Sequence, residues 1–129
     1  MITKYCNFCF STNTLTKFIS MVDSTLNKIY DEIDKKEYSF IDNISLEEGV
    51  LTINLKEDKT YVINIQKPNK QIWLSSPFSG PRRFEFNEAN NKWIDIHNSN
   101  NSLLSLISNE INNEIIKRKY PSNSKLSLL

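Results

Sequence analysis

The segment PNKQIWLSSPFSGPRRFEF (68–86) decides the fold, because it contains two alternating strands around one turn. Residues 70–76 and 82–86 repeat with a period of two, which is typical of β-strands. In both strands Ile72, Leu74, Phe84 and Phe86 lie on one side, and Gln71, Trp73, Arg83 and Glu85 lie on the other. Proline, serine and glycine between positions 76 and 81 indicate a turn. The segment therefore predicts an antiparallel hairpin with one apolar face.

The same period of two continues on both sides of this hairpin. It predicts strands over residues 50–55, 60–66 and 92–97, and in the last of these Ile94 and Ile96 are in phase. Beyond the strands the apolar step changes to three and four, which predicts helices over residues 17–36 and 101–119. Thr16 is a candidate cap for the first helix, and Asn101 or Ser102 for the second. The apolar stripes are Phe18, Val22, Leu26, Ile29 and Ile33, then Leu103, Ile107, Ile111 and Ile115.

The predicted fold is α+β, with two helices packed on one face of a five- to six-stranded antiparallel sheet. Both helices are amphipathic, so the opposite sheet face is expected to be open to solvent. That face would carry the side chains on the outward phase: Thr52, Asn54, Asn64, Gln71, Trp73 and Arg83. An exposed Trp beside an Arg is typical of a binding hot spot. The alternative is that Trp73 packs down among its neighbours and only shields the sheet.

Composition excludes several classes of function. The chain has 129 residues, with 16 basic and 15 acidic side chains, so a nucleic acid is not the expected partner. No apolar run approaches the ~20 residues of a membrane span. One histidine is too few for a multi-histidine metal site. Charge is nevertheless uneven, because residues 17–48 have a net charge of −4 and residues 59–84 a net charge of +5.

The two ends differ from the predicted domain over residues 17–120. Residues 1–16 contain one lysine, no acid and many hydroxyls, which is typical of an organelle-targeting leader; a secretory signal is the alternative. Cys6 and Cys9 form half of a zinc-type ligand set or are incidental. The tail over residues 121–129 contains Leu126, Leu128 and Leu129, which we expect to fold back across the helix pair.

The segment over residues 68–77, followed by Ser79-Gly80-Pro81 and Arg83-Phe84, closely resembles the signature of the frataxin family. The resemblance extends to Gly49-Val50-Leu51-Thr52, to Thr60-Tyr61-Val62-Ile63-Asn64 and to Lys92-Trp93. It covers about residues 17 to 120, which is nearly the whole predicted domain. The order of helix, strands and helix agrees with the frataxin fold independently.

The resemblance implies a protein of iron–sulfur cluster assembly, in the mitochondrial matrix or a mitochondrion-derived organelle. Frataxins bind a complex of cysteine desulfurase and scaffold protein, accelerate sulfur transfer and bind iron weakly. The family has also been credited with ferroxidase and iron-chaperone activity, so whether the protein is an enzyme stays open. We assign no catalytic residue, and we expect no membrane or nucleic-acid partner and a monomer when free.

Site residues carried over from the family fall in two groups. The partner-binding group on the sheet face comprises Asn64, Asn69, Gln71, Trp73 and Arg83. The iron-binding group on an acidic ridge comprises Asp23, Asp31, Asp34 and Asp42, with Glu37, Glu47 and Glu48 nearby. Asn27 stands where the family has an acid, so the ridge is expected to be thinner than in familiar eukaryotic members. On the sheet, Phe86 stands where the family has a further Trp.

The residues themselves leave alternatives open. Asp23, Asn27, Asp31 and Asp34 share one helix face, and carboxylates are hard ligands suited to iron, but an exposed row gives no closed geometry. The same row also reads as an ordinary solvated helix face. His97 at a strand end is either a metal ligand or a structural histidine. A single-stranded nucleic-acid binder is a third function, although one outward aromatic residue is few for base stacking.

Overall fold

Seven strands follow one another along the chain in the same order in which they pair. The computed structural model describes the backbone of residues 2–129, and the side chains from Thr14 onward except Ser122. The elements are α1 (Ile2–Lys36), β1 (Ile41–Glu47), β2 (Val50–Leu55), β3 (Lys59–Gln66), β4 (Gln71–Ser76), β5 (Gly80–Asn87), β6 (Lys92–Asp95), β7 (Asn98–Ser102), α2 (Leu103–Lys117) and the short helix η1 (Ser122–Ser124). Every neighbouring pair of strands is antiparallel.

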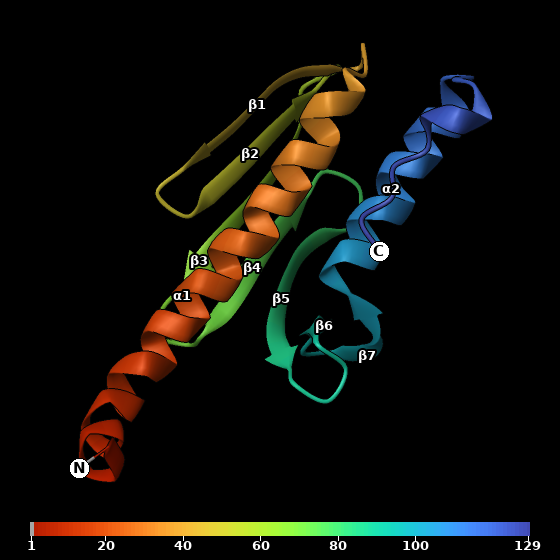
Figure 1. Ribbon diagram of the computed structural model, residues 1–129. Helices are drawn as coiled ribbons and strands as arrows, with labels where there is room; N and C mark the ends of the chain where they lie inside the picture. Colours follow the sequence, from red (N-terminus) through yellow and green to blue (C-terminus); the bar gives the residue numbers. More distant parts are fainter. Residues whose placement is uncertain (1) are drawn as a thin grey trace.

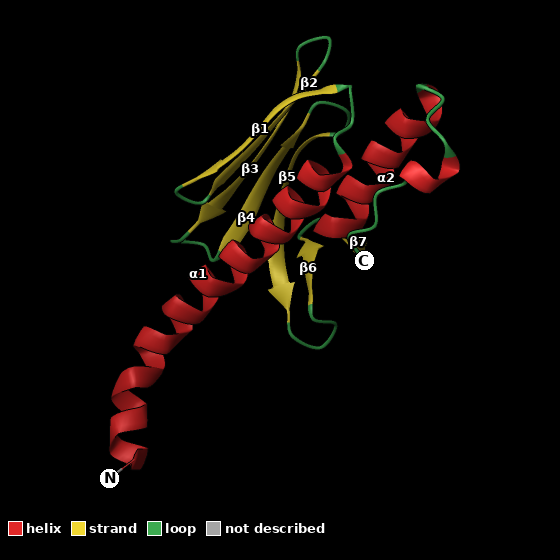
Figure 2. Cartoon of the chain, turned by 45° about the horizontal axis from the view of Figure 1, so that its top comes forward, coloured by secondary structure: helices red, strands yellow, loops and turns green. Residues whose placement is uncertain are grey.

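Both helices cover the same face of this sheet, as predicted (Figures 1 and 2). The helix stripes predicted from the sequence are buried against the inward residues of the strands, and Val22, Leu26 and Ile107 are fully covered. Within the described residues the outward face carries no helix, which confirms the expected two-layer α+β architecture. Ser102 is the N-cap of α2, because its side chain accepts a hydrogen bond from the backbone N–H of Ser105 at 3.3 Å.

The sheet has seven strands, two more than the five for which the sequence predicts residue ranges. β1 was missed because half-buried and exposed residues follow one another along it without strict alternation. β7 was missed because its sequence, NSNNS, is entirely polar. Both are outer strands with a neighbour on one side only, where packing demands fewer apolar residues.

The side chains of β6 that point into the core are not its isoleucines, although Ile94 and Ile96 alternate with the period of a strand. Trp93 and Asp95 are buried, whereas Ile94 is half-buried and Ile96 is 39% exposed. The register explains this, since β5 pairs the inward Phe86 with Trp93 and the inward Phe84 with Asp95. The buried Asp95 carboxylate is paired with the Arg82 guanidinium at 3.0 Å.

The first helix begins at Ile2, so the expected start after a Thr16 cap is wrong. The first 36 residues contain neither glycine nor proline, and therefore no strong helix breaker. The hypotheses for Cys6 and Cys9 concern side chains that lie outside the described residues. The division into a leader over residues 1–16 and a domain over residues 17–120 stays a prediction.

The C-terminal tail folds back over the helices, as expected for Leu126 and Leu128 but not for Leu129, which is 75% exposed. Leu126 and Leu128 are buried, with 3% and 0% of their surfaces exposed. The Asn112 side chain on α2 binds both backbone groups of Leu126, accepting from its N–H at 2.8 Å and donating to its carbonyl at 3.2 Å. The Tyr38 hydroxyl, just beyond α1, donates to the Ser124 carbonyl. The tail therefore links α2 to the end of α1.

A carboxylate on α2 holds the turn between β4 and β5. Glu110 accepts hydrogen bonds from the hydroxyls of Tyr61 at 2.9 Å, Ser76 at 2.6 Å and Ser79 at 2.5 Å. The Ser76 oxygen in turn accepts from the backbone N–H groups of Phe78 and Ser79. Burial, reinforced by the nearby Glu110 charge, raises the pKa of the Tyr61 hydroxyl well above its usual value. This network fixes the turn that sets the register of β4 and β5.

Candidate functional site

A row of side chains crosses the open face of the sheet at right angles to the strands. The register pairs Val50 with Asn64, Asn64 with Trp73, and Trp73 with Arg83. Neighbouring strands lie about 4.8 Å apart, so these residues from four strands are consecutive neighbours. Three of the five predicted partner-binding residues, Asn64, Trp73 and Arg83, are therefore brought together by the sheet. We call these three residues, with Val50, the open-face row.

Trp73 is held in place by its neighbours on this face. The Arg83 guanidinium carbon lies 4.6 Å from the centroid of the Trp73 ring, a cation–π arrangement. The indole N–H donates to the Gln71 side-chain oxygen at 2.8 Å, and the Gln71 amide donates to Glu85 at 2.9 Å. Trp73 is half-buried and so is neither free in solvent nor part of the core. Its orientation is fixed before any partner arrives.

Gln71 points to the predicted face, but only 7% of its surface is exposed. Its amide lies between Trp73 and Glu85 and bonds to both of them, beside the open-face row. Glu85 was not proposed as a site residue, although alternation already placed it on the side of Arg83. Its carboxylate accepts the bond from Gln71, so it belongs to the same polar network.

Asn69 is separate from the open-face row. It is exposed in the turn between β3 and β4, at the end of the sheet. It lines a groove of about 990 Å³ together with Thr16 and Lys17 of α1. Its predicted partner role would therefore require a contact at the end of the sheet.

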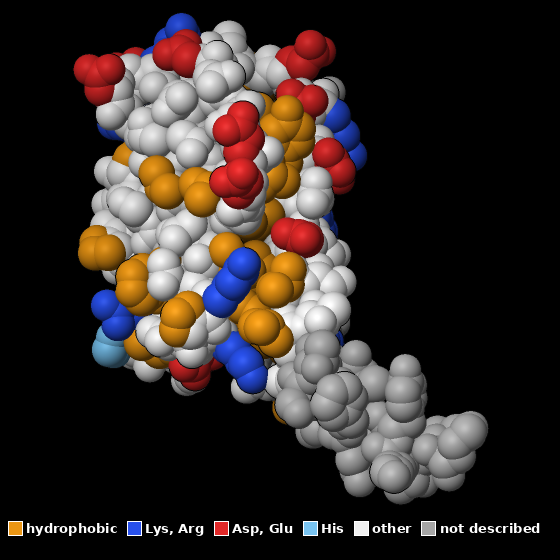
Figure 3. Space-filling model, turned by 90° about the vertical axis from the view of Figure 1, so that its left-hand side faces the viewer, with side chains coloured by type: hydrophobic (Ala, Val, Ile, Leu, Met, Phe, Trp, Pro, Cys, Tyr) orange, Lys and Arg blue, Asp and Glu red, His pale blue; other side chains and the backbone are white. Residues whose placement is uncertain are grey.

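The four predicted iron ligands are all exposed and lie on or after the C-terminal half of α1. Figure 3 shows acidic side chains gathered in the upper half of the molecular face that it presents. Asp34 and Asp42 line a shallow groove of about 320 Å³ between the end of α1 and β1, together with Glu37. In the part of the chain that the structure describes, no three histidine, cysteine or acidic side chains lie close enough to hold a metal ion.

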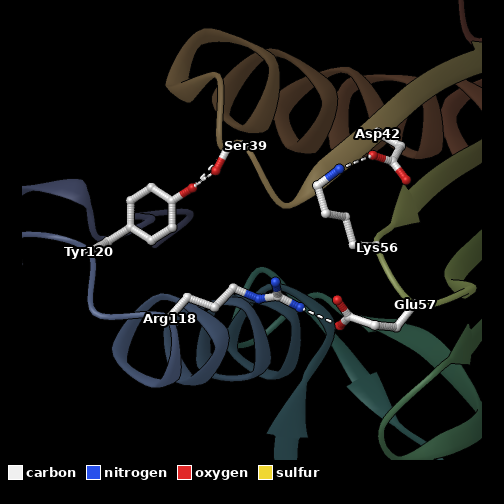
Figure 4. Close-up of polar contacts among 6 residues, drawn as sticks. All are labelled: Ser39, Asp42, Lys56, Glu57, Arg118 and Tyr120. Atoms are coloured by element: carbon white, nitrogen blue, oxygen red, sulfur yellow. Dashed lines mark hydrogen bonds and ion pairs between the residues drawn. The ribbon is translucent and has the colours of Figure 1, made fainter.

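Two acids at this end of the molecule already form ion pairs (Figure 4). The Lys56 ammonium lies 2.9 Å from the Asp42 carboxylate, and Arg118 lies 2.6 Å from Glu57. A cation at Asp42 would therefore have to compete with the ammonium of Lys56. Asn27 does not strengthen the ridge, because its amide donates to the Asp23 backbone carbonyl at 2.8 Å. His97 is exposed, and its backbone N–H donates to Asp95.

The fold and the site define a class of protein: a two-layer α+β module that presents a fixed aromatic and basic row on an uncovered sheet. A helix able to cross a membrane is absent from the described residues. A sequence profile described as "Frataxin-like domain" matches residues 11–117. The chain belongs to the frataxin family.

Named relatives support this assignment. The chain is 38% identical over 118 residues to the mitochondrial frataxin of Dictyostelium discoideum, covering 80% of this chain and 58% of that protein. It is 36% identical over 106 residues to the mitochondrial frataxin homolog of Saccharomyces cerevisiae, covering 80% and 59%. The chain thus spans about three-fifths of the length of these curated relatives.

Solved structures agree in fold. A trimeric yeast frataxin complexed with ferrous iron superposes with a TM-score of 0.66 at 35% identity, covering 74% of this chain and 86% of that one. A frataxin from Psychromonas ingrahamii superposes with a TM-score of 0.71 at 22% identity, covering 89% and 97%. This second likeness concerns the fold alone.

Proposed function

We propose that this protein is an iron–sulfur cluster assembly factor that binds a complex of cysteine desulfurase and scaffold protein. It stimulates sulfur transfer in that complex rather than catalysing a reaction of its own. The observation that carries this proposal is the open-face row, in which Arg83 lies over the Trp73 ring at 4.6 Å. Membership of the frataxin family supports the choice of partner.

The open-face row has the properties of an interface centre. Trp and Arg are the residue types that contribute most to binding energy when a partner excludes water from them. The Gln71 bond to the indole and the stacked guanidinium restrict the Trp73 rotamers, so less side-chain entropy is lost on binding. The planar Arg83 fork can bind a carboxylate or backbone carbonyl of the partner with two hydrogen bonds.

A second function, iron carriage, is supported by the acidic ridge. Ferrous iron would be the cargo, and the carboxylates of Asp23, Asp31, Asp34 and Asp42 are the hard oxygen ligands that suit it. All four are exposed, and no closed ligand set occurs among the described residues, so we expect weak binding with many water ligands. Ferroxidase activity would require these same carboxylates. The relative solved with ferrous iron supports the cargo.

We place the protein in the mitochondrial matrix or a mitochondrion-derived organelle, because the named relatives are mitochondrial frataxins. We propose a monomer when free, although the yeast relative is described as trimeric.

The test compares Trp73→Ala and Arg83→Lys with Ile116→Ala, a matched truncation of a side chain that is 64% exposed on α2. Desulfurase turnover and affinity for the complex are measured with and without iron, together with the unfolding midpoint. Trp73→Ala should stay folded and lose about 30-fold in affinity, and Arg83→Lys should weaken binding less. Ile116→Ala should behave as the parent protein. If both open-face variants activate normally, the proposal is wrong.

A further inference from the structure

A groove of about 950 Å³ runs between α1, the turn from β5 to β6, and the start of α2. Residues of both helices line it, and Figure 2 shows both helices on one side of the sheet, opposite the face of the open-face row. Its rim includes Lys17 and Lys28 of α1 and Lys92 of β6, and Met21, Phe86 and Trp93 also line it. Neither the open-face row nor the acidic ridge includes any of these residues.

The three rim lysines are all exposed, and within the described residues none of them forms an ion pair. Four other cations of the molecule do have acidic partners: Lys35, Lys56, Arg82 and Arg118. Among the described residues that line the groove, Glu88 is the one acid. The groove therefore has a local excess of positive charge, with three lysines against one glutamate, on a nearly neutral chain.

The spacing of these charges limits what can occupy the groove. Lys17, Met21, Ser24 and Lys28 follow one another at steps of four, three and four, so they lie on one face of α1. At 1.5 Å per residue, the two lysines are about 16 Å apart along the helix axis. A single small anion cannot reach both of them. A partner helix with acidic residues three turns apart can.

The floor of the groove is apolar and ordered. The Phe86 and Trp93 rings meet edge to face at 5.3 Å. The Trp93 indole N–H donates to the Thr25 hydroxyl at 3.0 Å, and that hydroxyl donates to the Met21 carbonyl at 2.9 Å. Leu129, which is 75% exposed, also lines the groove. An apolar floor between basic ends is complementary to a helix with an apolar face and acidic flanks.

We propose that this groove binds an acidic amphipathic helix of a partner protein, independently of the open-face row. Apolar side chains of that helix lie over Met21, Phe86 and Trp93, and its carboxylates pair with Lys17, Lys28 and Lys92. The charges supply specificity and association rate, and the apolar floor supplies contact area.

The experiment uses the full chain and a synthetic amphipathic helical peptide of about eighteen residues, with glutamates about 16 Å apart beside a leucine stripe. A twin peptide replaces the glutamates with glutamine. Calorimetry at low and high salt measures affinity, and amide chemical shifts locate the contact. We expect the acidic peptide to bind, with weaker binding at high salt and for the twin. Shift changes should fall on α1, β6 and the start of α2.

The decisive variant is Lys17→Glu/Lys28→Glu/Lys92→Glu, and the matched control is Lys67→Glu/Lys117→Glu/Lys125→Glu, which changes the net charge equally at exposed lysines outside the groove. The groove variant should lose at least about tenfold in affinity, and the control much less. Replacement of the same groove lysines by glutamine serves if charge reversal impairs folding. Three results would overturn the proposal. They are equal losses of peptide affinity in the groove and control variants, no binding of the acidic peptide by the parent protein, and tighter binding of the parent protein to anionic lipid vesicles than to the peptide.

Discussion

Trp73 and Arg83 are ten positions apart in the chain, and their side chains are in contact. Asp31 and Asp34 are only three positions apart on α1, but both are acidic, so their side chains repel each other. Both pairs belong to candidate functional surfaces. On the sheet, register places side chains from different strands next to each other. On α1, the helical rise spreads carboxylates along an exposed edge.

The difference indicates what each surface can do. The open-face row is supported by a hydrogen-bond network from Trp73 to Glu85, so its geometry exists before binding. The acidic ridge has no such support among the described residues, and Asp42 is already paired with Lys56. A fixed row suits recognition of one protein surface, and a loose ridge suits weak binding of a hydrated cation.

The largest expected effect comes from deleting residues 125–129, which should loosen the helix layer but not the sheet register. Leu126 and Leu128 are buried, so their loss should lower the free energy of unfolding by about 3–6 kcal/mol. Hydrogen exchange should accelerate in α1 and α2 more than in β4 and β5. Uniform acceleration over helices and strands would show that the open-face row depends on the tail as much as the ridge does.

A second comparison sets Gln71→Ala against Asn27→Ala, one amide from each surface. Gln71 is buried, and its removal leaves the Trp73 indole and the Glu85 carboxylate without their partner, at a cost of about 1–3 kcal/mol. Asn27 is exposed and its amide donates to a carbonyl of its own helix, so its variant should change the free energy of unfolding by less than about 0.5 kcal/mol. Denaturant titration measures both. Equal costs would remove the distinction between supported and unsupported surfaces.

A double-mutant cycle on Trp73 and Arg83 measures their coupling directly. The cation–π contact at 4.6 Å on a half-buried ring should couple them favourably by about 0.5–1 kcal/mol. A parallel cycle on Asp31 and Asp34 should give a weak unfavourable coupling, because like charges one turn apart repel. Absence of coupling would mean that the Trp73 and Arg83 side chains are neighbours that do not stabilise each other.

The smallest effect on stability is expected from Asp23→Asn/Asp31→Asn/Asp34→Asn. Removing repulsion on an exposed helix face should leave the free energy of unfolding unchanged or raise it by a few tenths of a kcal/mol. Ferrous iron binding, measured by calorimetry, should fall in the same protein. Undiminished iron binding would contradict the ridge hypothesis, while the open-face row would be unaffected.

Much of the open-face site could be predicted from the sequence, because alternation along a strand tells which side chains share a face. Alternation in residues 82–86 placed Arg83 and Glu85 on one side, and alternation in residues 70–76 placed Trp73 and Gln71 on the corresponding side. Alternation cannot say which residue of one strand faces which residue of the next. The pairing of Trp73 with Arg83 and the burial of Gln71 between Trp73 and Glu85 therefore appeared only with the register.

The groove with the three rim lysines was even less accessible from the sequence than the open-face row. Lys17 and Lys28 are visible as a helix stripe, but Lys92 and Trp93 come from a strand more than sixty residues later. Tertiary packing alone brings them to one rim. The polar strand β7 was likewise missed, because it is held by backbone hydrogen bonds to β6 and leaves little trace in side-chain pattern.

By itself, the sequence determined the two helices, most of the sheet, the uncovered face and the resemblance to frataxin, because periodicity and turn chemistry are local properties. The tertiary structure decided the outer strands β1 and β7 and the side chains that meet on the open face. It also decided that Asp42 is paired with Lys56. These features depend on strand register and on contacts between distant segments, whose free energy no local pattern encodes.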